Sequence, residues 1–508
     1  MSNCIRKLLL LWLAMAAIAQ GGLVLPPLFQ DHLVLQRNRP VPVWGWADPG
    51  SWVSVKFRGE TAQTRAAPDG CWDVRLKPLM ASSLPEDLVI SAGETRTIRD
   101  VLVGDVWLCS GQSNMAWSVG ASDNPDREVP AAHWPRIRHF KVALTVADKP
   151  QTSVSGSWTV CSPATVSLYS AVGYYFAREL QRNLDVPIGI ITCAFGGSAV
   201  EAWLSEEAFA KDESLSAVSR RWTETVAGVT PLQRLDYERA RERWKKAVEE
   251  AEESRGWLVA PVAPWPPPGP GSFLMPSGLF NGMLHPLLPV ELAGVLWYQG
   301  EANAIRAKEY ASLFRRLITS WREAFQQTEL PFYWIQLPGF RAVDTTGESW
   351  AWLREAQSAA LSLPNTDQVV TIDLGNPQSI HPTNKQAVGR RAAARVIAKA
   401  LGKQMDEVSF DRAVREGDAL RVHFKPAGSE LISIRGLLPE FTLAGEDGRF
   451  FPAEARLEGE TIVVRTKEVP APCAVRYAWR NAPEVDLFTK QGLPVPPFRS
   501  DALPALTE

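Results

Sequence analysis

The sequence VLVGDVWLC at residues 101–109 is nearly continuous in apolar side chains and runs directly into SGQSNM at residues 110–115. An apolar run without alternation is typical of a parallel strand that helices cover on both faces. Two similar runs follow, at residues 186–195 and 293–298. We therefore expect three buried parallel strands, the first of which leads into a turn that contains a serine.

Apolar residues recur at helical spacing between these strands, at residues 171–183 and 310–325. Strands that alternate with helices predict an α/β domain, a doubly wound parallel sheet with helices on both faces. In such a sheet the functional site forms where the carboxyl ends of the strands meet. We place this domain at residues 101–402.

The segments on either side contain short strands separated by turns. In the first, two strand-like runs flank the turn sequence ADPG at residues 47–50. In the second, residues 419–424 and 461–465 show the same strand pattern. We therefore expect an N-terminal β domain at residues 21–100 and a C-terminal β domain at residues 403–508.

Residues 230–272 interrupt the α/β domain. Residues 232–255 are charge-rich with helical character, which predicts a solvated surface helix. Residues 259–270 are dominated by proline, which predicts a stiff connector or a lid-like excursion. The whole insertion is a candidate wall of the substrate cleft.

The composition excludes some partners. A formal net charge of -2 over 508 residues leaves no basic excess to hold a phosphate backbone, so we expect no nucleic-acid partner.

Residues 1–20 have basic residues, a short apolar run and a small-x-small site, which predicts a signal peptide. No later stretch is long and apolar enough to predict a membrane span. We expect a protein exported to the periplasm or secreted, of unknown oligomeric state.

Ser113 follows the first buried strand, where its own N–H and a helix N-terminus would be available to an anion. A Gly-x-Ser sequence alone usually marks a turn or a helix cap, and the second glycine of G-x-S-x-G is absent. Three further segments strengthen the hypothesis of a site. They are FGGS at residues 195–198, WYQGEAN at residues 297–303 and IHPTNK at residues 380–385. The glycines allow a backbone N–H to approach a ligand, and the amides could bind an oxyanion.

The chain has six histidines, and their positions favour one as a general base. His32 and His423 lie in the expected β domains, and two more lie in a polar segment that we expect to be irregular. The remaining pair is His381, on the loop before a late helix, and His285. We predict His381 as the base and His285 as a structural or substrate-lining residue.

Together these segments resemble the sialate O-acetylesterase family, a branch of the SGNH hydrolases that includes acetylesterases acting on plant polysaccharides. The matching blocks are Gly-Gln-Ser-Asn-Met, Gly-Gly-Ser with a downstream tryptophan, Gln-Gly-Glu-x-Asn and His-Pro-x-Asn-Lys. The resemblance covers nearly the whole mature chain. Its further matches are Leu35-Gln36, Val43-Trp44-Gly45, residues 279–283, residues 354–357, residues 492–494 and residues 497–499.

The resemblance implies an SGNH-type fold and a serine esterase mechanism without metal or cofactor. It makes Ser113 the nucleophile and His381 the general base. The Ser113 and Gly197 N–H groups and a side-chain amide from Gln299 or Asn303 would form the oxyanion hole. Candidate substrate-lining residues are Gln112, Asn114, Asn281, His285 and Arg354.

The third member of a catalytic triad stays open. SGNH enzymes usually carry an aspartate two or three residues before the histidine, but Gln378 and Ser379 occupy those positions. Asp373 and Glu301 are candidates to orient the imidazole, and a Ser–His dyad assisted by a backbone carbonyl is an equal alternative.

The predicted function is hydrolysis of O-acetyl groups on carbohydrates, with an O-acetylated saccharide as the partner. A sialate O-acetylesterase-like activity is the first expectation. Alternatives are an acetylesterase acting on plant xyloglucan or xylan, and a non-catalytic carbohydrate-binding protein. The 20 tryptophans suit stacking on sugar rings, but they equally suit core packing.

Overall fold

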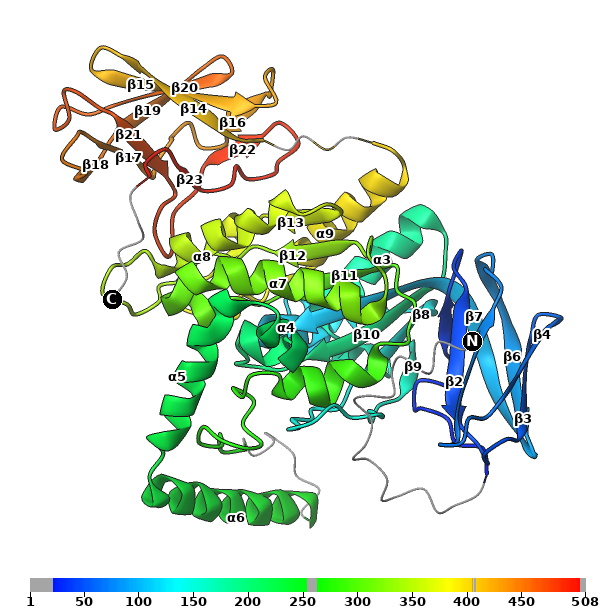
Figure 1. Ribbon diagram of the computed structural model, residues 1–508. Helices are drawn as coiled ribbons and strands as arrows, with labels where there is room; N and C mark the ends of the chain where they lie inside the picture. The colour runs from blue at the N-terminus through cyan, green and yellow to red at the C-terminus, as the bar shows by residue number, and fades with distance from the viewer. Residues whose placement is uncertain (1–21, 254–262, 404, 406–407, 503–508) are drawn as a thin grey trace.

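The computed structural model describes residues 22–253, 263–403, 405 and 408–502. Within this part of the chain, a central α/β domain carries a β domain at each end (Figure 1). The expected signal peptide and residues 259–262 of the proline-rich segment lie outside the described residues.

The central sheet is built from the predicted buried runs. Its order is β13-β12-β11-β7-β10-β8-β9, and all neighbouring strands in this order are parallel except β8 and β9. The predicted runs form β7, β10 and β11, whereas β8 arises from a segment that we expected to be irregular. The bounds are β7 (Glu94–Gly111), β8 (Trp134–Lys141), β9 (Trp158–Cys161), β10 (Ile188–Ala194), β11 (Gly294–Tyr298), β12 (Phe332–Ile335) and β13 (Thr366–Val369).

Helices cover both faces of this sheet (Figure 1). On one face α3 (Ala171–Leu184) packs against α9 (Lys385–Ala400), and both contact strands of the sheet. On the other face α7 (Ala307–Phe325) packs against α8 (Ser349–Ser358). The predicted α/β class is confirmed.

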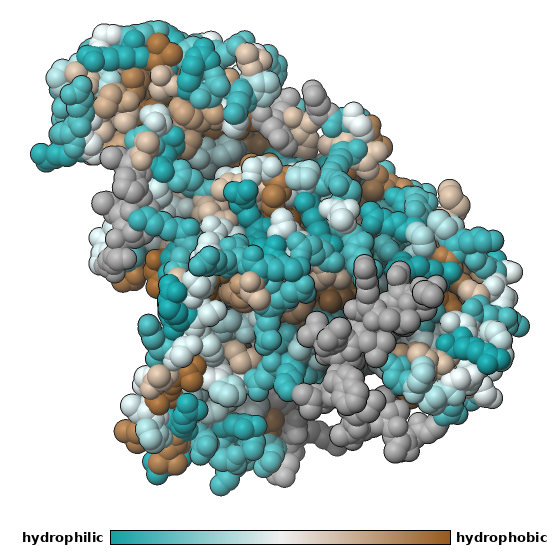
Figure 2. Space-filling view, viewed as in Figure 1, coloured by the Kyte–Doolittle hydropathy of each residue, from teal (hydrophilic) through white to brown (hydrophobic). Residues whose placement is uncertain are grey.

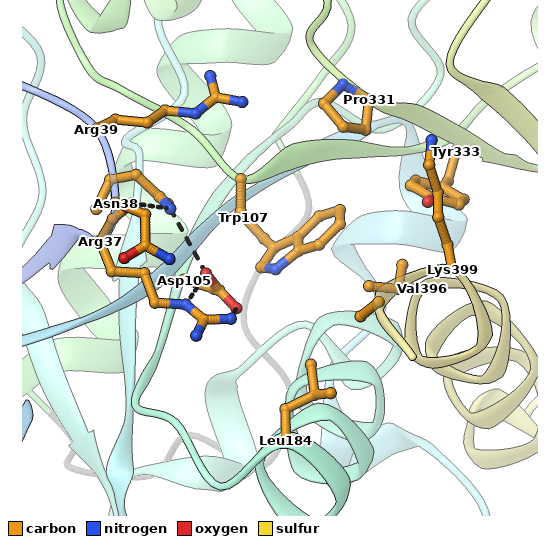
Figure 3. Close-up of a pocket in the computed structure, with 13 residues that line it drawn as sticks. Arg37, Asn38, Arg39, Asp105, Trp107, Leu184, Pro331, Tyr333, Val396 and Lys399 are labelled. Atoms are coloured by element: carbon orange, nitrogen blue, oxygen red, sulfur yellow. Dashed lines mark hydrogen bonds and ion pairs between the residues drawn. The ribbon is translucent and has the colours of Figure 1, made fainter. Parts of the chain in front are cut away.

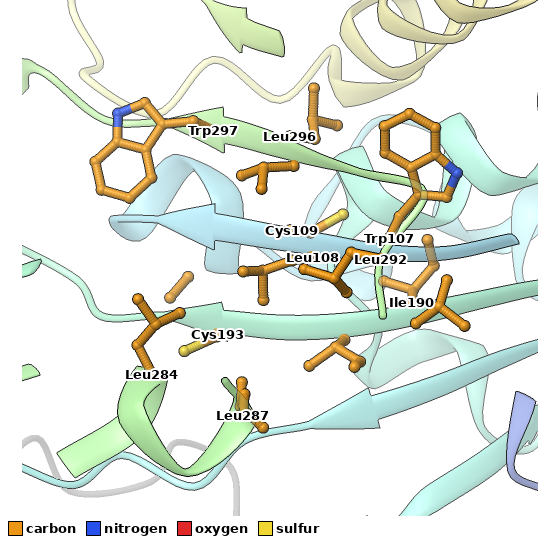
Figure 4. Close-up of a cluster of buried hydrophobic side chains, with 14 of the residues drawn as sticks. Trp107, Leu108, Cys109, Ile190, Cys193, Leu284, Leu287, Leu292, Leu296 and Trp297 are labelled. Atoms are coloured by element: carbon orange, nitrogen blue, oxygen red, sulfur yellow. The ribbon is translucent and has the colours of Figure 1, made fainter. Parts of the chain in front are cut away.

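The core explains why β7 and its neighbours have no polar face. Figure 4 shows apolar side chains that leave β7, β10 and β11 toward both sides of the sheet. The Trp107 ring of β7 meets Phe176 of α3 edge to face, with centroids 4.9 Å apart. The Trp297 ring of β11 meets Trp321 of α7 in the same way at 5.6 Å. Such burial is worth about 25 cal/mol per Å² of apolar surface, so the strands are held from both faces.

The border between the N-terminal and central domains is a strand. The first half of β7 pairs with β6 (Ser82–Ala92) in the N-terminal sheet, and residues 105–111 pair with β10 in the central sheet. Our expected boundary at residue 100 therefore falls inside a continuous strand. The other strands of the N-terminal domain are β1 (Val34–Gln36), β2 (Val41–Trp46), β3 (Trp52–Phe57), β4 (Glu60–Arg65) and β5 (Cys71–Leu76).

The C-terminal domain contains antiparallel strands, as its turn pattern predicts. One sheet has the order β14-β15-β20-β19, another β18-β17-β21-β23, and β16 pairs with β22. The bounds are β14 (Ser409–Glu416), β15 (Ala419–Lys425), β16 (Leu431–Ser433), β17 (Phe441–Ala444), β18 (Phe450–Pro452), β19 (Glu454–Glu458), β20 (Thr461–Arg465), β21 (Ala474–Tyr477), β22 (Leu487–Thr489) and β23 (Phe498–Arg499).

Helices occupy much of the described chain between β10 and β11. They are α4 (Glu206–Ala210), α5 (Ser216–Ala227) and α6 (Pro231–Glu253). Of these, α6 lies in the expected insertion at residues 230–272 and corresponds to the expected solvated helix. Figure 2 shows a mostly hydrophilic face, with brown atoms at the corner where α5 meets α6. Leu232 and Leu235 at the start of α6 are 63% and 41% exposed.

Arg354 of α8 joins the central and C-terminal domains. Its side chain is fully buried and donates hydrogen bonds to four backbone carbonyls. The acceptors are Leu337 at 2.9 Å, Pro338 at 3.3 Å, Arg480 at 2.9 Å and Asn481 at 2.7 Å. The expectation that Arg354 lines the substrate is wrong, because no part of its side chain reaches solvent.

Replacing Arg354 should therefore weaken the fold. Arg354→Met leaves buried carbonyls without donors, and each unpaired buried group costs about 1–3 kcal/mol. We expect a clear drop in the midpoint of thermal unfolding, measured by calorimetry. The exposed Arg390 provides the control, and Arg390→Met should leave the midpoint close to wild type. Equal midpoints for Arg354→Met and wild type would contradict this role.

Candidate active site

The carboxyl ends of three strands meet in one row. Gly111 of β7 lies opposite Ala194 of β10 and Tyr298 of β11. A Cβ at Gly111 would lie 2.1 Å from the Tyr298 carbonyl oxygen, and its φ of 134° lies in the region that favours glycine. Only glycine fits this close approach. The three segments that follow these strands leave the sheet side by side.

Ser113 and His381 are brought together at this edge. Ser113 begins the short helix α1 (Ser113–Ala116), and His381 lies on the loop before α9. The His381 Nε2 atom lies 2.7 Å from Ser113 Oγ, although 268 positions separate them in sequence. The pair predicted as nucleophile and base therefore has the geometry of a hydrogen-bonded couple, and both side chains are half-buried.

The surroundings of His381 favour a neutral imidazole. Its ring stacks on Trp117, with centroids 5.0 Å apart and planes 22° apart. Its backbone N–H donates to Ser379 Oγ at 3.2 Å. Burial, and then the positive charge of Lys385, lower the pKa of His381 from its ordinary value of 6.5. At neutral pH the ring can accept a proton from Ser113.

Neither predicted triad acid contacts His381. Asp373 forms a two-pronged ion pair with Arg391, with both distances 2.6 Å. Glu301 accepts a hydrogen bond from Asn114 Nδ2 at 2.5 Å. In the described part of the chain, no group forms a hydrogen bond with His381 Nδ1. The acid of a triad stays unassigned.

Two backbone N–H groups are open beside Ser113. Neither the Ser113 N–H nor the Gly197 N–H donates to another residue that the structure describes. A Cβ built at Gly196 would lie 3.6 Å from Ser113 Cβ, so the glycine loop after β10 lies against the serine. Gly197 itself has a φ of 75°, which glycine adopts readily. Both N–H groups are available to a developing oxyanion.

The amides of Gln299 and Asn303 are engaged in holding this loop. Gln299 Nε2 donates to Ser198 O at 3.1 Å and to Asn303 Oδ1 at 2.8 Å. Asn303 Nδ2 donates to Glu201 Oε2 at 2.8 Å, and both side chains are fully buried. Both amide hydrogens of Gln299 are engaged in these hydrogen bonds. Gln299 therefore stabilises the loop after β10 and has no free amide hydrogen to donate to an oxyanion.

A buried polar cluster lies behind the Ser113–His381 pair. Asn114 donates from Nδ2 to Glu301 Oε1 and to Ile380 O, the latter at 2.9 Å, and its Oδ1 accepts from Lys385 Nζ. Burial raises the pKa of Glu301 and lowers that of Lys385 to about 7. This cluster ties helix α1 to the loop of His381. Sequence reasoning missed Lys385, although it closes the IHPTNK segment.

The other predicted substrate-lining residues have structural contacts. Gln112 Oε1 accepts from Gly300 N at 3.4 Å, and the side chain is 3% exposed. Asn281 is 2% exposed and donates to Ala147 O at 3.3 Å, so its assignment to the substrate surface is wrong. His285 Nδ1 lies 2.8 Å from Gln151 O, which supports its structural alternative. Asn114 belongs to the buried cluster.

A separate cavity of about 270 Å³ lies at the other end of the sheet (Figure 3). It is lined at the amino ends of the strands by Asp105, Ala293 and Pro331, and Arg37 pairs with Asp105 at 2.8 Å. None of the predicted site residues lines it. Within the described residues, no group of three or more His, Cys, Asp or Glu could hold a metal ion, and no helix has the length and hydropathy to cross a membrane.

Comparisons with known proteins agree in pointing to one family. Residues 103–252 and 281–398 match the sequence model of the family described as carbohydrate esterase, sialic acid-specific acetylesterase. The sialate O-acetylesterase of Rattus norvegicus is 30% identical over an alignment 443 positions long, which covers 78% of this chain and 77% of that protein. The chain belongs to this family. It is a carboxylic ester hydrolase.

Further relatives of the esterase extend the match. The sialate O-acetylesterase of Homo sapiens is 27% identical over an alignment 533 positions long, which covers 92% of this chain and 90% of that protein. A crystal structure of a carbohydrate acetylesterase from Xanthomonas citri aligns with a TM-score of 0.80 and 36% identity. That alignment covers 95% of the esterase and all of the Xanthomonas citri chain.

The environment of His381 predicts the acid limb of the pH profile. Only the neutral imidazole accepts the Ser113 proton, so kcat/KM should fall as the pH drops through the pKa of His381. Because burial and Lys385 lower this pKa, activity should persist at pH 6.5 and be lost only in more acidic solution. The measurement is kcat/KM for 4-nitrophenyl acetate against pH, with recovery of activity at neutral pH as the control for unfolding. A half-maximal point above pH 6.5 would contradict the assignment.

Proposed function

We propose that the esterase is a serine hydrolase of the SGNH type that removes O-acetyl groups from glycans. The observation that carries this proposal is the 2.7 Å contact between His381 Nε2 and Ser113 Oγ beside two open backbone N–H groups. A serine needs an adjacent base to become a nucleophile, and acyl transfer needs donors for the oxyanion. The site offers both at the carboxyl edge of a parallel sheet.

The reaction follows from these positions. His381 takes the Ser113 proton while Oγ bonds to the acetyl carbonyl carbon, and the oxyanion accepts hydrogen bonds from the Ser113 and Gly197 N–H groups. One such donor is worth roughly 3 to 4 kcal/mol. The bond to the sugar oxygen then breaks, and His381 returns the proton to that oxygen. Water repeats the sequence on the acetyl-serine, which releases acetate and restores Ser113.

The substrate class is an O-acetylated saccharide, for which two candidates stand. The relatives named sialate O-acetylesterase favour an acetylated sialic acid. The other candidate is a neutral plant polysaccharide such as xyloglucan or xylan. Arg354, the one arginine among the predicted substrate-lining residues, is fully buried and so cannot pair with a sialate carboxylate. A non-catalytic binding role would not need the Ser113–His381 couple. The signal-peptide pattern supports export to the periplasm or beyond.

Removing the nucleophile tests the mechanism. Ser113→Ala and His381→Ala should each lower kcat by a factor of about 10³ or more, because the two residues act as one unit. Acetate release would be measured from 4-nitrophenyl acetate, O-acetylated sialic acid, acetyl-xylan and acetylated xyloglucan. The exposed Ser362 gives a matched control, and Ser362→Ala should keep wild-type rates. Full activity in Ser113→Ala would overturn the mechanism. The substrate that the wild-type enzyme hydrolyses fastest identifies the class of glycan.

A further inference from the structure

Trp265 is an unusually exposed aromatic side chain near the site. It lies between α6 and β11, in the proline-rich part of the insertion, and 65% of its surface is exposed. Large apolar side chains are normally buried unless they contact a partner or ligand, although single exposed ones also occur. The residues around Trp265 indicate whether it contacts a ligand or is an isolated exposed side chain.

The Trp265 indole is fixed to the site edge of the sheet by an aromatic stack. Its ring meets Phe273 edge to face, with centroids 4.8 Å apart and planes 88° apart. Phe273 in turn stacks on Phe195 at 5.2 Å and 19°. Phe195 directly follows β10, and its N–H donates to Gly111 O at 3.0 Å. The stack therefore starts at the row of strand ends that also positions Ser113.

The same indole lies against the glycine loop of the oxyanion site. A Cβ built at Gly197 would lie 2.8 Å from Trp265 Cη2, so the indole touches the place where a side chain would begin. The preceding Gly196 lies against Ser113. One loop thus separates the exposed indole from Ser113, so the indole lies next to the site and not in it.

We propose that Trp265 forms a sugar-binding subsite that stacks on the pyranose ring next to the acetylated unit. This inference rests on the proposed function and adds that the substrate is a glycan chain. An indole face offers a rigid apolar surface that complements the C–H face of a pyranose, and it loses little conformational freedom on binding. The nitrophenyl ring of 4-nitrophenyl acetate takes the place of the acetylated sugar, so this simple ester has no second ring to place on the indole. Trp265 therefore determines preference for chains.

The test compares chain and simple substrates in Trp265→Ala, Trp265→Phe and wild type. The chain substrate is the one that wild type hydrolyses fastest among acetylated xylo-oligosaccharides, acetylated xyloglucan fragments and an O-acetylated sialyl oligosaccharide. For Trp265→Ala, we expect kcat/KM on this chain to fall about tenfold more than on 4-nitrophenyl acetate, mainly through KM. Trp265→Phe should recover part of the loss.

A second exposed tryptophan supplies the control. Trp52 in the N-terminal domain is 61% exposed, and the Arg65 guanidinium lies over its ring at 4.5 Å. Trp52→Ala should leave both substrates at wild-type rates. Equal losses on chain and simple substrates in Trp265→Ala would mean a purely structural role and would overturn the subsite, as would no loss at all. Failure of the proposed function is recognised separately, because Ser113→Ala would then stay active.

Discussion

The close approach of β7 and β11 at Gly111 is the constraint on which the site depends. A side chain at this position would collide with the Tyr298 carbonyl, so the strand ends can meet in register only around glycine. Because the three strands end in one row, Ser113, the Gly196–Gly197 loop and Glu301 leave the sheet as neighbours. The apolar packing on both faces of β7 holds this row in place.

The buried cluster of Asn114, Glu301 and Lys385 adds a second constraint. Its hydrogen bonds connect Asn114, the residue after Ser113, to the loop that carries His381. Breaking a buried charged network usually costs several kcal/mol, since the remaining charge is left unpaired. The cluster therefore links the stability of the fold to the distance between Ser113 and His381.

The sequence predicts much of this arrangement. Uninterrupted apolar runs predict β7, β10 and β11. The polar segments single out Ser113 and His381, and the structure brings these two side chains within 2.7 Å of each other. The errors concern side chains whose partners lie far away in sequence. Arg354 donates hydrogen bonds to the carbonyls of residues 480 and 481, and the Gln299 amide donates to the Ser198 carbonyl. No local sequence pattern predicts contacts between residues so far apart in the chain. The domain boundary was missed because β7 is one strand shared by two sheets.

Active-site labelling tests the central claim most directly. The full-length esterase would be treated with a fluorophosphonate, digested and analysed by mass spectrometry to locate the modified residue. The account predicts a single adduct on Ser113, formed slowly or not at all in His381→Ala because the base that activates the hydroxyl is gone. An adduct on another serine, with Ser113 unmodified in the inactivated enzyme, would contradict it.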